Sequence, residues 1–259
     1  MKTGITLALW LFGALGGSAA LAQSGSGEHL LIYAAAAVKN AFTEIAAEYE
    51  AQTGHTVTVV FDTAGATERN FLADARAALM ITSHSRIERA TREGALEDGT
   101  TTVLGVTVAG IAVPPGSPKP DVSSADSLRA ALLAADRIAF SDPGRGATVG
   151  THFAGVIESL GVREAVMAKA TLATNGLETM RLVLEEGVDI GITQTVEIQQ
   201  ASREAYAGPF PEAFELATAY SLWHRNDLSG PVADFVAQLL APAGRERIAA
   251  DGLRPPGAP

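Results

Sequence analysis

Short apolar, β-branched runs alternate with amphipathic stretches along the N-terminal part of the chain. The run 30–33 is followed by apolar residues at helical spacing over 38–49, and a β-branched run covers 56–61. A third run, 78–82, leads into a further amphipathic stretch that ends near Gly94. This repeated order of strand and helix predicts an α/β fold, in which helices cover a parallel sheet.

The strand and helix pattern starts again after a long, nearly uncharged run at 101–113. Prolines and a glycine at 114–116 end this run, which suits a strand that leaves one domain and enters another. The apolar stretch 214–223 precedes two closing helices, so we expect the chain to return to its first domain there. The predicted lobes comprise residues 23–108 together with 219–259, and residues 109–218.

The first 22 residues have the pattern of a secretory signal peptide. Lys2 precedes an apolar run at 5–15 that is too short to span a bilayer, and the small residues up to Ala22 suit a cleavage site. A buried N-terminal helix is the alternative interpretation. We expect residues 1–22 to be removed on export, leaving a periplasmic protein that does not insert into a membrane.

The composition narrows the set of partners and cofactors. The chain carries a net charge of −10 and has no long basic run, which disfavours nucleic acid and anionic membrane surfaces. It has no cysteine, which excludes disulfides, thiolate metal ligands, cysteine nucleophiles and a lipid-acceptor cysteine. The histidines are scattered without acidic or histidine neighbours at ligand spacing. We therefore expect no metal, no cofactor and a monomer.

Several segments, taken in order, carry a resemblance to a known family: 33–37, 61–66, 141–143, 150–153 and 160–161. In sequence they resemble the periplasmic molybdate-binding proteins, over nearly all of the chain that follows the signal peptide. The resemblance implies a type II periplasmic-binding-protein fold with two lobes, each a mostly parallel sheet with helices on both faces. It also implies a small anion in the cleft between the lobes and an ABC transporter permease as partner.

The chain departs from the family's pattern at two positions that would hold the ligand. The two serines whose hydroxyls the resemblance places on the anion are replaced by Ala37 and Ala64, although Thr63 offers a hydroxyl beside the second. Backbone N–H groups at the helix starts near Ala36, Ala37 and Ala64 remain available to an anion. The alternative is that these alanines only pack closely against the sheet.

The loop 141–148 precedes a predicted helix and contains two candidate ligand contacts. The guanidinium group of Arg145 matches a carboxylate, so we favour a small organic polycarboxylate over molybdate. A solvated surface arginine is the alternative. Thr148 either caps the helix or contacts the ligand, and Val149 follows it at the helix start.

Gln194 follows the predicted buried strand 188–193, where the second lobe would offer polar groups to a ligand. Its amide can both donate and accept hydrogen bonds. The predicted ligand-binding residues are Ala36, Ala37, Thr63, Ala64, Arg145, Thr148, Val149 and Gln194.

A second hypothesis comes from the pair His152–Phe153 after the Asp-Pro loop. Relatives with this pair are similar to a periplasmic aconitate isomerase, in which His152 would move a proton between carbons, with His84 and Glu197 as further candidates. The sequence thus leaves open a solute-binding protein for a small organic polycarboxylate or oxyanion serving ABC-type import, and an enzyme that interconverts cis- and trans-aconitate. A third reading, a sensor or docking module, predicts a shallow cleft.

Overall fold

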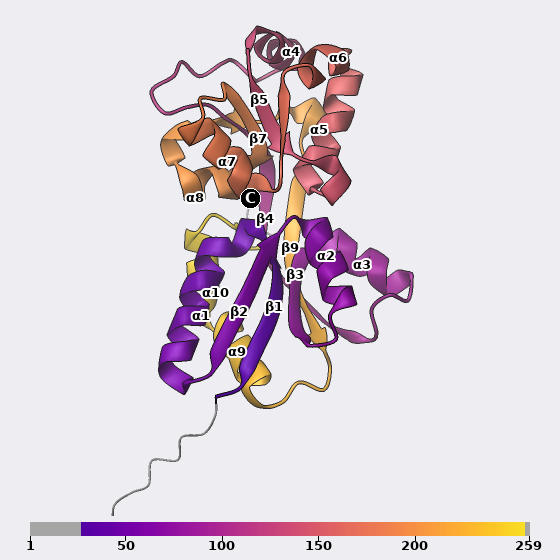
Figure 1. Ribbon diagram of the computed structural model, residues 1–259, viewed down its shortest axis with the longest axis vertical. Helices are drawn as coiled ribbons and strands as arrows, with labels where there is room; N and C mark the ends of the chain where they lie inside the picture. Colours follow the sequence, from indigo (N-terminus) through magenta and orange to yellow (C-terminus); the bar gives the residue numbers. More distant parts are fainter. Residues whose placement is uncertain (1–26, 257–259) are drawn as a thin grey trace, which may run out of the picture.

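Two lobes lie end to end, and the strand β4 (Gly99–Ala112) runs from one into the other (Figure 1). The computed structural model describes residues 27–256, so the predicted signal peptide lies outside the described residues. The strand β9 (Ala217–Arg225) pairs antiparallel with β4, from Gly99 opposite Arg225 to Val108 opposite Ala217. The strand order is β2-β1-β3-β9-β4-β7-β5-β6, and β8 pairs with β4.

The first lobe is built on β1 (His29–Ala35), β2 (Thr56–Asp62) and β3 (Ala77–Ser83). β1 lies between β2 and β3 and is parallel to both, as the repeated strand and helix pattern predicted. The short 3-10 helix η1 (Ala36–Val38) joins β1 to the first helix. The helices of this lobe are α1 (Lys39–Thr53), α2 (Ala64–Ala73), α3 (His84–Arg92), α9 (Gly230–Leu240) and α10 (Pro242–Ala250).

The second lobe is built on β5 (Ile138–Ser141), β6 (Ala170–Ala173), β7 (Ile190–Gln194) and β8 (Tyr206–Pro209). β5 is parallel to β6 and β7, whereas β7 and β8 are antiparallel to β4. The helices are α4 (Ala125–Ala134), α5 (Thr148–Ser159), α6 (Arg163–Met167), α7 (Gly176–Glu185) and α8 (Thr195–Ala201), with the 3-10 helices η2 (Pro143–Arg145), η3 (Arg203–Ala205) and η4 (Glu212–Phe214).

The expectation of a mostly parallel sheet holds for the strands that alternate with helices. It does not extend to the long strands: β9 is antiparallel to both β3 and β4. Within β4 the partner changes, because Val108 is the last residue paired with β9 and Ala109 is the first paired with β7. The predicted lobe boundaries at 108 and 218 fall inside β4 and β9, and they stay predictions.

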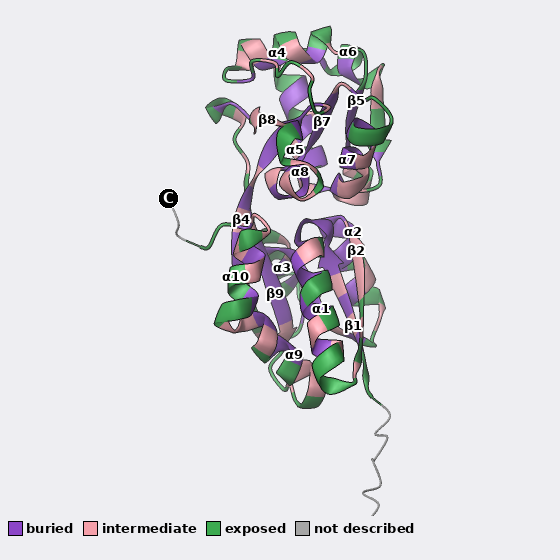
Figure 2. Ribbon diagram, turned by 90° about the vertical axis from the view of Figure 1, so that its left-hand side faces the viewer, coloured by how far each residue is buried: buried purple, intermediate pink, exposed green. Residues whose placement is uncertain are grey.

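Each lobe has its own hydrophobic core, with buried strands and exposed outer faces of the helices (Figure 2). In the first lobe, Phe42, Ile45 and Tyr49 of α1 are buried at the predicted helical spacing, and Gly54 ends the helix with a φ of 74°. In the second, the rings of Phe140 and Phe153 lie with centroids 5.0 Å apart. No helix in the described part of the chain combines the length and the apolar character needed to cross a membrane.

Three helices begin directly after the carboxyl end of a strand. α2 follows β2, α3 follows β3, and α8 follows β7, each within two residues of the strand. The starts of α2, α7 and α8 lie where the two lobes meet (Figure 1). Because the N-terminus of a helix presents unpaired N–H groups, this topology directs hydrogen-bond donors into the space between the lobes.

Candidate functional site

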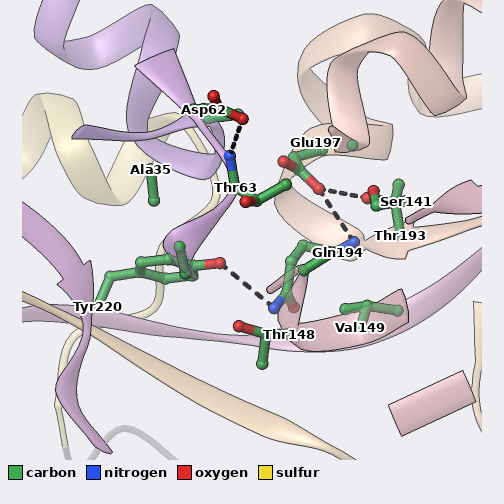
Figure 3. A pocket seen from close by; sticks show the side chains of 14 residues that line it. Ala35, Asp62, Thr63, Ser141, Thr148, Val149, Thr193, Gln194, Glu197 and Tyr220 are labelled. Carbon is green, nitrogen blue, oxygen red and sulfur yellow. Dashed lines mark hydrogen bonds between the residues drawn. The ribbon is translucent and has the colours of Figure 1, made fainter. Parts of the chain in front are cut away.

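A small cavity lies between the lobes, where the strands of both lobes end. It contains about 300 Å³ of space between atoms, its opening included, and Figure 3 shows the side chains around it. Both lobes contribute to its wall, so a molecule bound there would touch both. The lining residues are Ala35, Ala36, Asp62, Thr63, Ala64 and Tyr220 from the first lobe, and Ser141, Ala147, Thr148, Val149, Gly176, Thr193, Gln194 and Glu197 from the second.

The first turns of α2, α5 and α7 border this cavity. α2 starts at Ala64, α5 at Thr148 and α7 at Gly176, and all three residues line the cavity wall. The N-terminus of a helix carries unpaired N–H donors and a partial positive charge. The cavity therefore attracts an anion through backbone dipoles. Among the described residues that line it, none is lysine, arginine or histidine.

Two buried polar atoms at the cavity have no hydrogen-bond partner within the protein. They are the hydroxyl of Thr148 and the side-chain oxygen of Gln194. The amide nitrogen of Gln194 donates to the hydroxyls of Thr218 at 3.0 Å and Tyr220 at 3.4 Å. Either orientation of the amide leaves one of its polar atoms free, because both hydroxyls can donate or accept. An unpaired buried polar group costs the folded protein about 1–3 kcal/mol of stability. Both groups therefore indicate that a ligand binds here.

The alternative role of Thr148 as a helix cap is wrong. The N-cap of α5 is Ala147, and Thr148 is the first residue of the helix, with no side-chain bond to a backbone N–H. Thr63, in contrast, is the N-cap of α2, and its hydroxyl accepts a hydrogen bond from the Ala66 N–H at 3.1 Å. The Thr148 hydroxyl thus remains free for a molecule in the cavity.

Glu197 places a buried carboxyl group at the cavity. Its side chain is 5% exposed, and one oxygen accepts hydrogen bonds from the Thr193 hydroxyl and, at 3.2 Å, from the Gln194 backbone N–H. Burial raises the pKa of this carboxyl group above its ordinary value. From the sequence, Glu197 was only a further base candidate, because a single sequence does not show in which direction a side chain in the first turn of a helix points.

Arg145 contacts the opposite lobe and does not line the cavity. Its Nη2 atom lies 2.9 and 2.8 Å from the two carboxylate oxygens of Asp62, and its Nε donates to the Thr174 carbonyl at 2.9 Å. Its own carbonyl accepts hydrogen bonds from the hydroxyl of Thr63 at 2.8 Å and from Arg69 at 3.2 Å. Arg145 therefore holds the two lobes together in the closed arrangement.

Two glycines allow the lobes to approach at the same place. The Gly65 N–H donates to the Gly146 carbonyl at 3.1 Å, and that carbonyl also accepts a bond from Arg86 at 3.0 Å. A Cβ atom on Gly65 would lie 2.7 Å from the Gly146 Cα, and Gly146 has a φ of 76°. Only residues without a side chain fit at this contact.

The remaining predicted residues lie in different surroundings. Ala36, Val149 and Ala64 line the cavity, whereas Ala37 is buried beside it and its carbonyl accepts a bond from Gln200 at 3.0 Å. Residues outside the predicted ligand-binding set also line it. They include Ala35, Asp62, Ser141, Ala147, Gly176, Thr193 and Tyr220.

Neither candidate histidine lines the cavity. The Nε2 atom of His152 lies 2.8 Å from the Phe214 carbonyl, and its ring packs against Phe210 with centroids 5.8 Å apart. The Nδ1 atom of His84 lies 2.9 Å from the Ser221 hydroxyl. The role of His152 in the isomerase hypothesis required contact with the substrate, and this position does not provide it.

Solved structures with the same fold bind several different solutes. The periplasmic molybdate-binding protein of Azotobacter vinelandii has a TM-score of 0.67 and 17% identity, covering 88% of this chain and 99% of that one. A phosphate-bound putative phosphate ABC transporter substrate-binding protein from Clostridium perfringens has a TM-score of 0.65 and 10% identity, with the same coverage of both chains. The sulfate-binding protein SubI of Mycobacterium tuberculosis has a TM-score of 0.65 and 16% identity, covering 89% and 88%.

These identities are low, so the likeness establishes the fold, which is that of the type II periplasmic binding proteins. No curated protein matches the sequence. The sequence profile of one family, described as bacterial extracellular solute-binding protein, matches residues 30–254. Since the match covers both lobes and the cleft between them, the chain belongs to the family of bacterial extracellular solute-binding proteins.

Proposed function

We propose that the protein captures a compact inorganic oxyanion in the cavity between its lobes and presents it to an ABC importer. The observation that carries this proposal is the convergence of the N-termini of α2, α5 and α7 on a small cavity. Thr148 and Gln194, whose buried polar atoms lack a partner, line the same cavity. Helix N-termini are well-known anion sites, and a compact anion can meet several of them at once.

The contacts of Arg145 argue against an organic polycarboxylate as the ligand. That preference depended on a guanidinium group facing the ligand, but Arg145 is paired with Asp62. A tricarboxylate would bring three negative charges next to Asp62 and Glu197 without a lining cation. Burying unpaired charges in this way is expensive. A single oxyanion held by backbone dipoles fits the cavity better.

The structural neighbours support an oxyanion and an importer. Those proteins are described as binding molybdate, phosphate and sulfate, and one is described as the substrate-binding protein of a putative ABC transporter. Export to the periplasm through the signal peptide at residues 1–22 is part of the proposal, because a solute-binding protein must meet its ligand outside the inner membrane. The protein is proposed to act as a monomer.

Closure of the lobes would trap the ligand. Thr63 and Ala64 approach the cavity from the first lobe, and Thr148 and Gln194 approach it from the second. An anion that bridges them stabilises the closed arrangement over an open one, which is the usual hinge mechanism of two-lobed binding proteins. The contacts between Arg145 and Asp62 and between Gly65 and Gly146 then complete the closed state.

The isomerase hypothesis lacks its proposed base, because His152 lies away from the cavity. Glu197 is the carboxyl group with a raised pKa that lines the cavity, and it could in principle move a proton. An enzyme would convert one aconitate isomer into the other, whereas a carrier would leave it unchanged. Incubation of the protein with cis-aconitate, followed by NMR, separates the two functions.

A thermal-shift and calorimetric screen tests the binding proposal. The purified protein is titrated with phosphate, arsenate, sulfate, molybdate, tungstate, citrate and both aconitates. A ligand at 100 times its Kd stabilises the folded protein by about 2.7 kcal/mol, which is a clear rise in Tm. We expect this rise with at least one inorganic oxyanion. Stabilisation by citrate or aconitate alone, or by none of these compounds, would overturn the proposal.

A further inference from the structure

The carboxyl group of Glu197 is unusual in a cavity that attracts anions. It is almost completely buried, it lines the cavity, and it comes from the second lobe at the start of α8. A carboxylate next to an oxyanion is repulsive unless a proton lies between their oxygens. The side chain therefore constrains which oxyanions the site can accept.

The two oxygens of Glu197 have different surroundings. Oε2 accepts hydrogen bonds from Thr193 and from the Gln194 N–H, and it lies against Gly176, where any Cβ atom would overlap it. Oε1 has no hydrogen-bond partner among the described residues. Figure 3 shows it on the side of the carboxyl group that faces Thr63, across the cavity. One oxygen is thus fixed by the protein, and the other is available to a ligand.

The titratable groups that share the cavity do not neutralise Glu197. Asp62 lies on the opposite wall, and its charge is balanced by Arg145. Tyr220 also lines the cavity, and burial raises the pKa of its hydroxyl far above neutrality, so that it stays uncharged. Neither group supplies a positive charge that would pair with Glu197.

The elements packed on α8 add no cation that pairs with Glu197. On α7, Arg181 is ion-paired with Glu178 and Glu185. On β8, burial raises the pKa of Tyr206. Arg203 and Glu204 of η3 are exposed to solvent. The sequences of β4, β7 and η1 contain no titratable side chain.

We infer that Glu197 selects oxyanions that carry a proton at neutral pH, the phosphate and arsenate class, over sulfate and molybdate. This inference rests on the proposed function and names its ligand class. Hydrogen phosphate brings an O–H group that donates to Oε1 of Glu197, while its remaining oxygens accept from the helix N-termini and the Thr148 hydroxyl. Sulfate and molybdate carry no proton at neutral pH, so their oxygens would face the carboxylate directly.

The proton balance makes the inference measurable. Hydrogen phosphate and the Glu197 carboxylate together already hold the single proton that the complex needs. Sulfate and the same carboxylate hold none, so the complex must take one proton from solvent. Above the pKa of Glu197, the affinity for sulfate falls by about tenfold per pH unit, while the affinity for phosphate stays nearly constant. Because burial raises the pKa of Glu197, this uptake begins at a higher pH than it would for an exposed carboxylate.

The test measures Kd values by calorimetry for phosphate, arsenate, sulfate and molybdate at about pH 7.5 and 8.5. Buffers with different ionisation enthalpies give the number of protons taken up. The variants are Glu197→Gln and, as a matched control on the surface, Glu158→Gln, whose carboxylate lies 3.6 Å from Arg163. In Glu197→Gln the amide oxygen can keep the bonds from Thr193 and Gln194, and the amide nitrogen becomes a donor facing the ligand.

We expect the wild-type protein and Glu158→Gln to prefer phosphate over sulfate by ten- to a hundredfold. In Glu197→Gln, phosphate should bind at least tenfold more weakly and sulfate at least tenfold more tightly. Equal, pH-independent affinities for all four anions in the wild-type protein would overturn the inference and leave the proposed function standing. The wild-type pH series gives this answer even if the variant does not fold. Absence of binding by every oxyanion would overturn the proposed function as well.

Discussion

The guanidinium group of Arg145 and the carboxylate of Asp62 join the two lobes beside the cavity. The Nη2 atom lies 2.9 and 2.8 Å from the carboxylate oxygens, although the two residues are 83 positions apart in the chain. Asp62 ends β2 in the first lobe, and Arg145 ends η2 in the second. This ion pair exists only when the lobes are closed, so its contribution belongs to closure and ligand affinity.

Replacing Arg145 is expected to weaken ligand binding without unfolding the protein. The Arg145 side chain is 40% exposed, and partly exposed ion pairs contribute about 0.2–1 kcal/mol. Arg145→Ala also leaves the Asp62 carboxylate unpaired beside the anion, so we expect a loss of about three- to tenfold in affinity for phosphate, measured by calorimetry. The double variant Asp62→Asn/Arg145→Ala should recover part of the lost affinity for phosphate. Arg163→Ala removes an exposed ion pair and serves as the control. An equal loss of affinity in this variant would contradict the role of Arg145 in closure.

A side chain at Gly65 is expected to block closure. A Cβ atom would lie 2.7 and 2.8 Å from the Gly146 Cα and carbonyl oxygen, so Gly65→Ala should hold the lobes apart. We expect at least a tenfold loss of affinity for phosphate and a larger radius of gyration in X-ray scattering with phosphate present. Gly155→Ala is the matched helical control, because a Cβ there meets no atom within 4 Å. Unchanged affinity and size in Gly65→Ala would show that closure does not need this contact.

The hydroxyl of Thr148 is expected to matter for binding and not for folding. It has no partner in the protein, so Thr148→Val removes an unsatisfied buried group and should leave Tm unchanged or slightly higher. A hydrogen bond to a charged ligand contributes about 1.5–3 kcal/mol, which corresponds to a loss of affinity of roughly ten- to a hundredfold. Thr67→Val is the control, because its hydroxyl is equally unpartnered but lies outside the cavity lining. Similar affinities in both variants would exclude a ligand role for Thr148.

Burial of Glu197 predicts a pH-dependent stability in the protein without ligand. The pKa of its carboxyl group is raised above 4.5 in the folded state. As the pH rises through this range, the unfolded chain loses the proton first, so the folded state binds more protons and its stability falls with increasing pH. Glu197→Gln lacks this effect and should gain stability relative to the wild-type protein as the pH rises above about 4.5. Urea unfolding at several pH values measures the difference, and a difference independent of pH would contradict a raised pKa.

Part of the candidate site could be predicted from the sequence. Thr63, Thr148 and Gln194 line the cavity because each lies at a predicted strand end or helix start, and such positions meet at one edge of a parallel sheet. His152 was also placed near a helix start, but its ring turns to the Phe214 carbonyl. The direction in which a helical side chain points depends on packing against other elements, and a single sequence does not show it.

The local elements and their order could be predicted from the sequence. Apolar residues at a spacing of two or of 3.6 depend only on near neighbours, so the strand at β2 and the helix α1 with its stop at Gly54 could be predicted. The pairing of Arg145 with Asp62 and the orientation of Glu197 Oε1 towards the cavity became apparent only in the folded structure. These relationships join groups on separate elements, and their energies depend on burial and distance, which exist only after the lobes have folded and met.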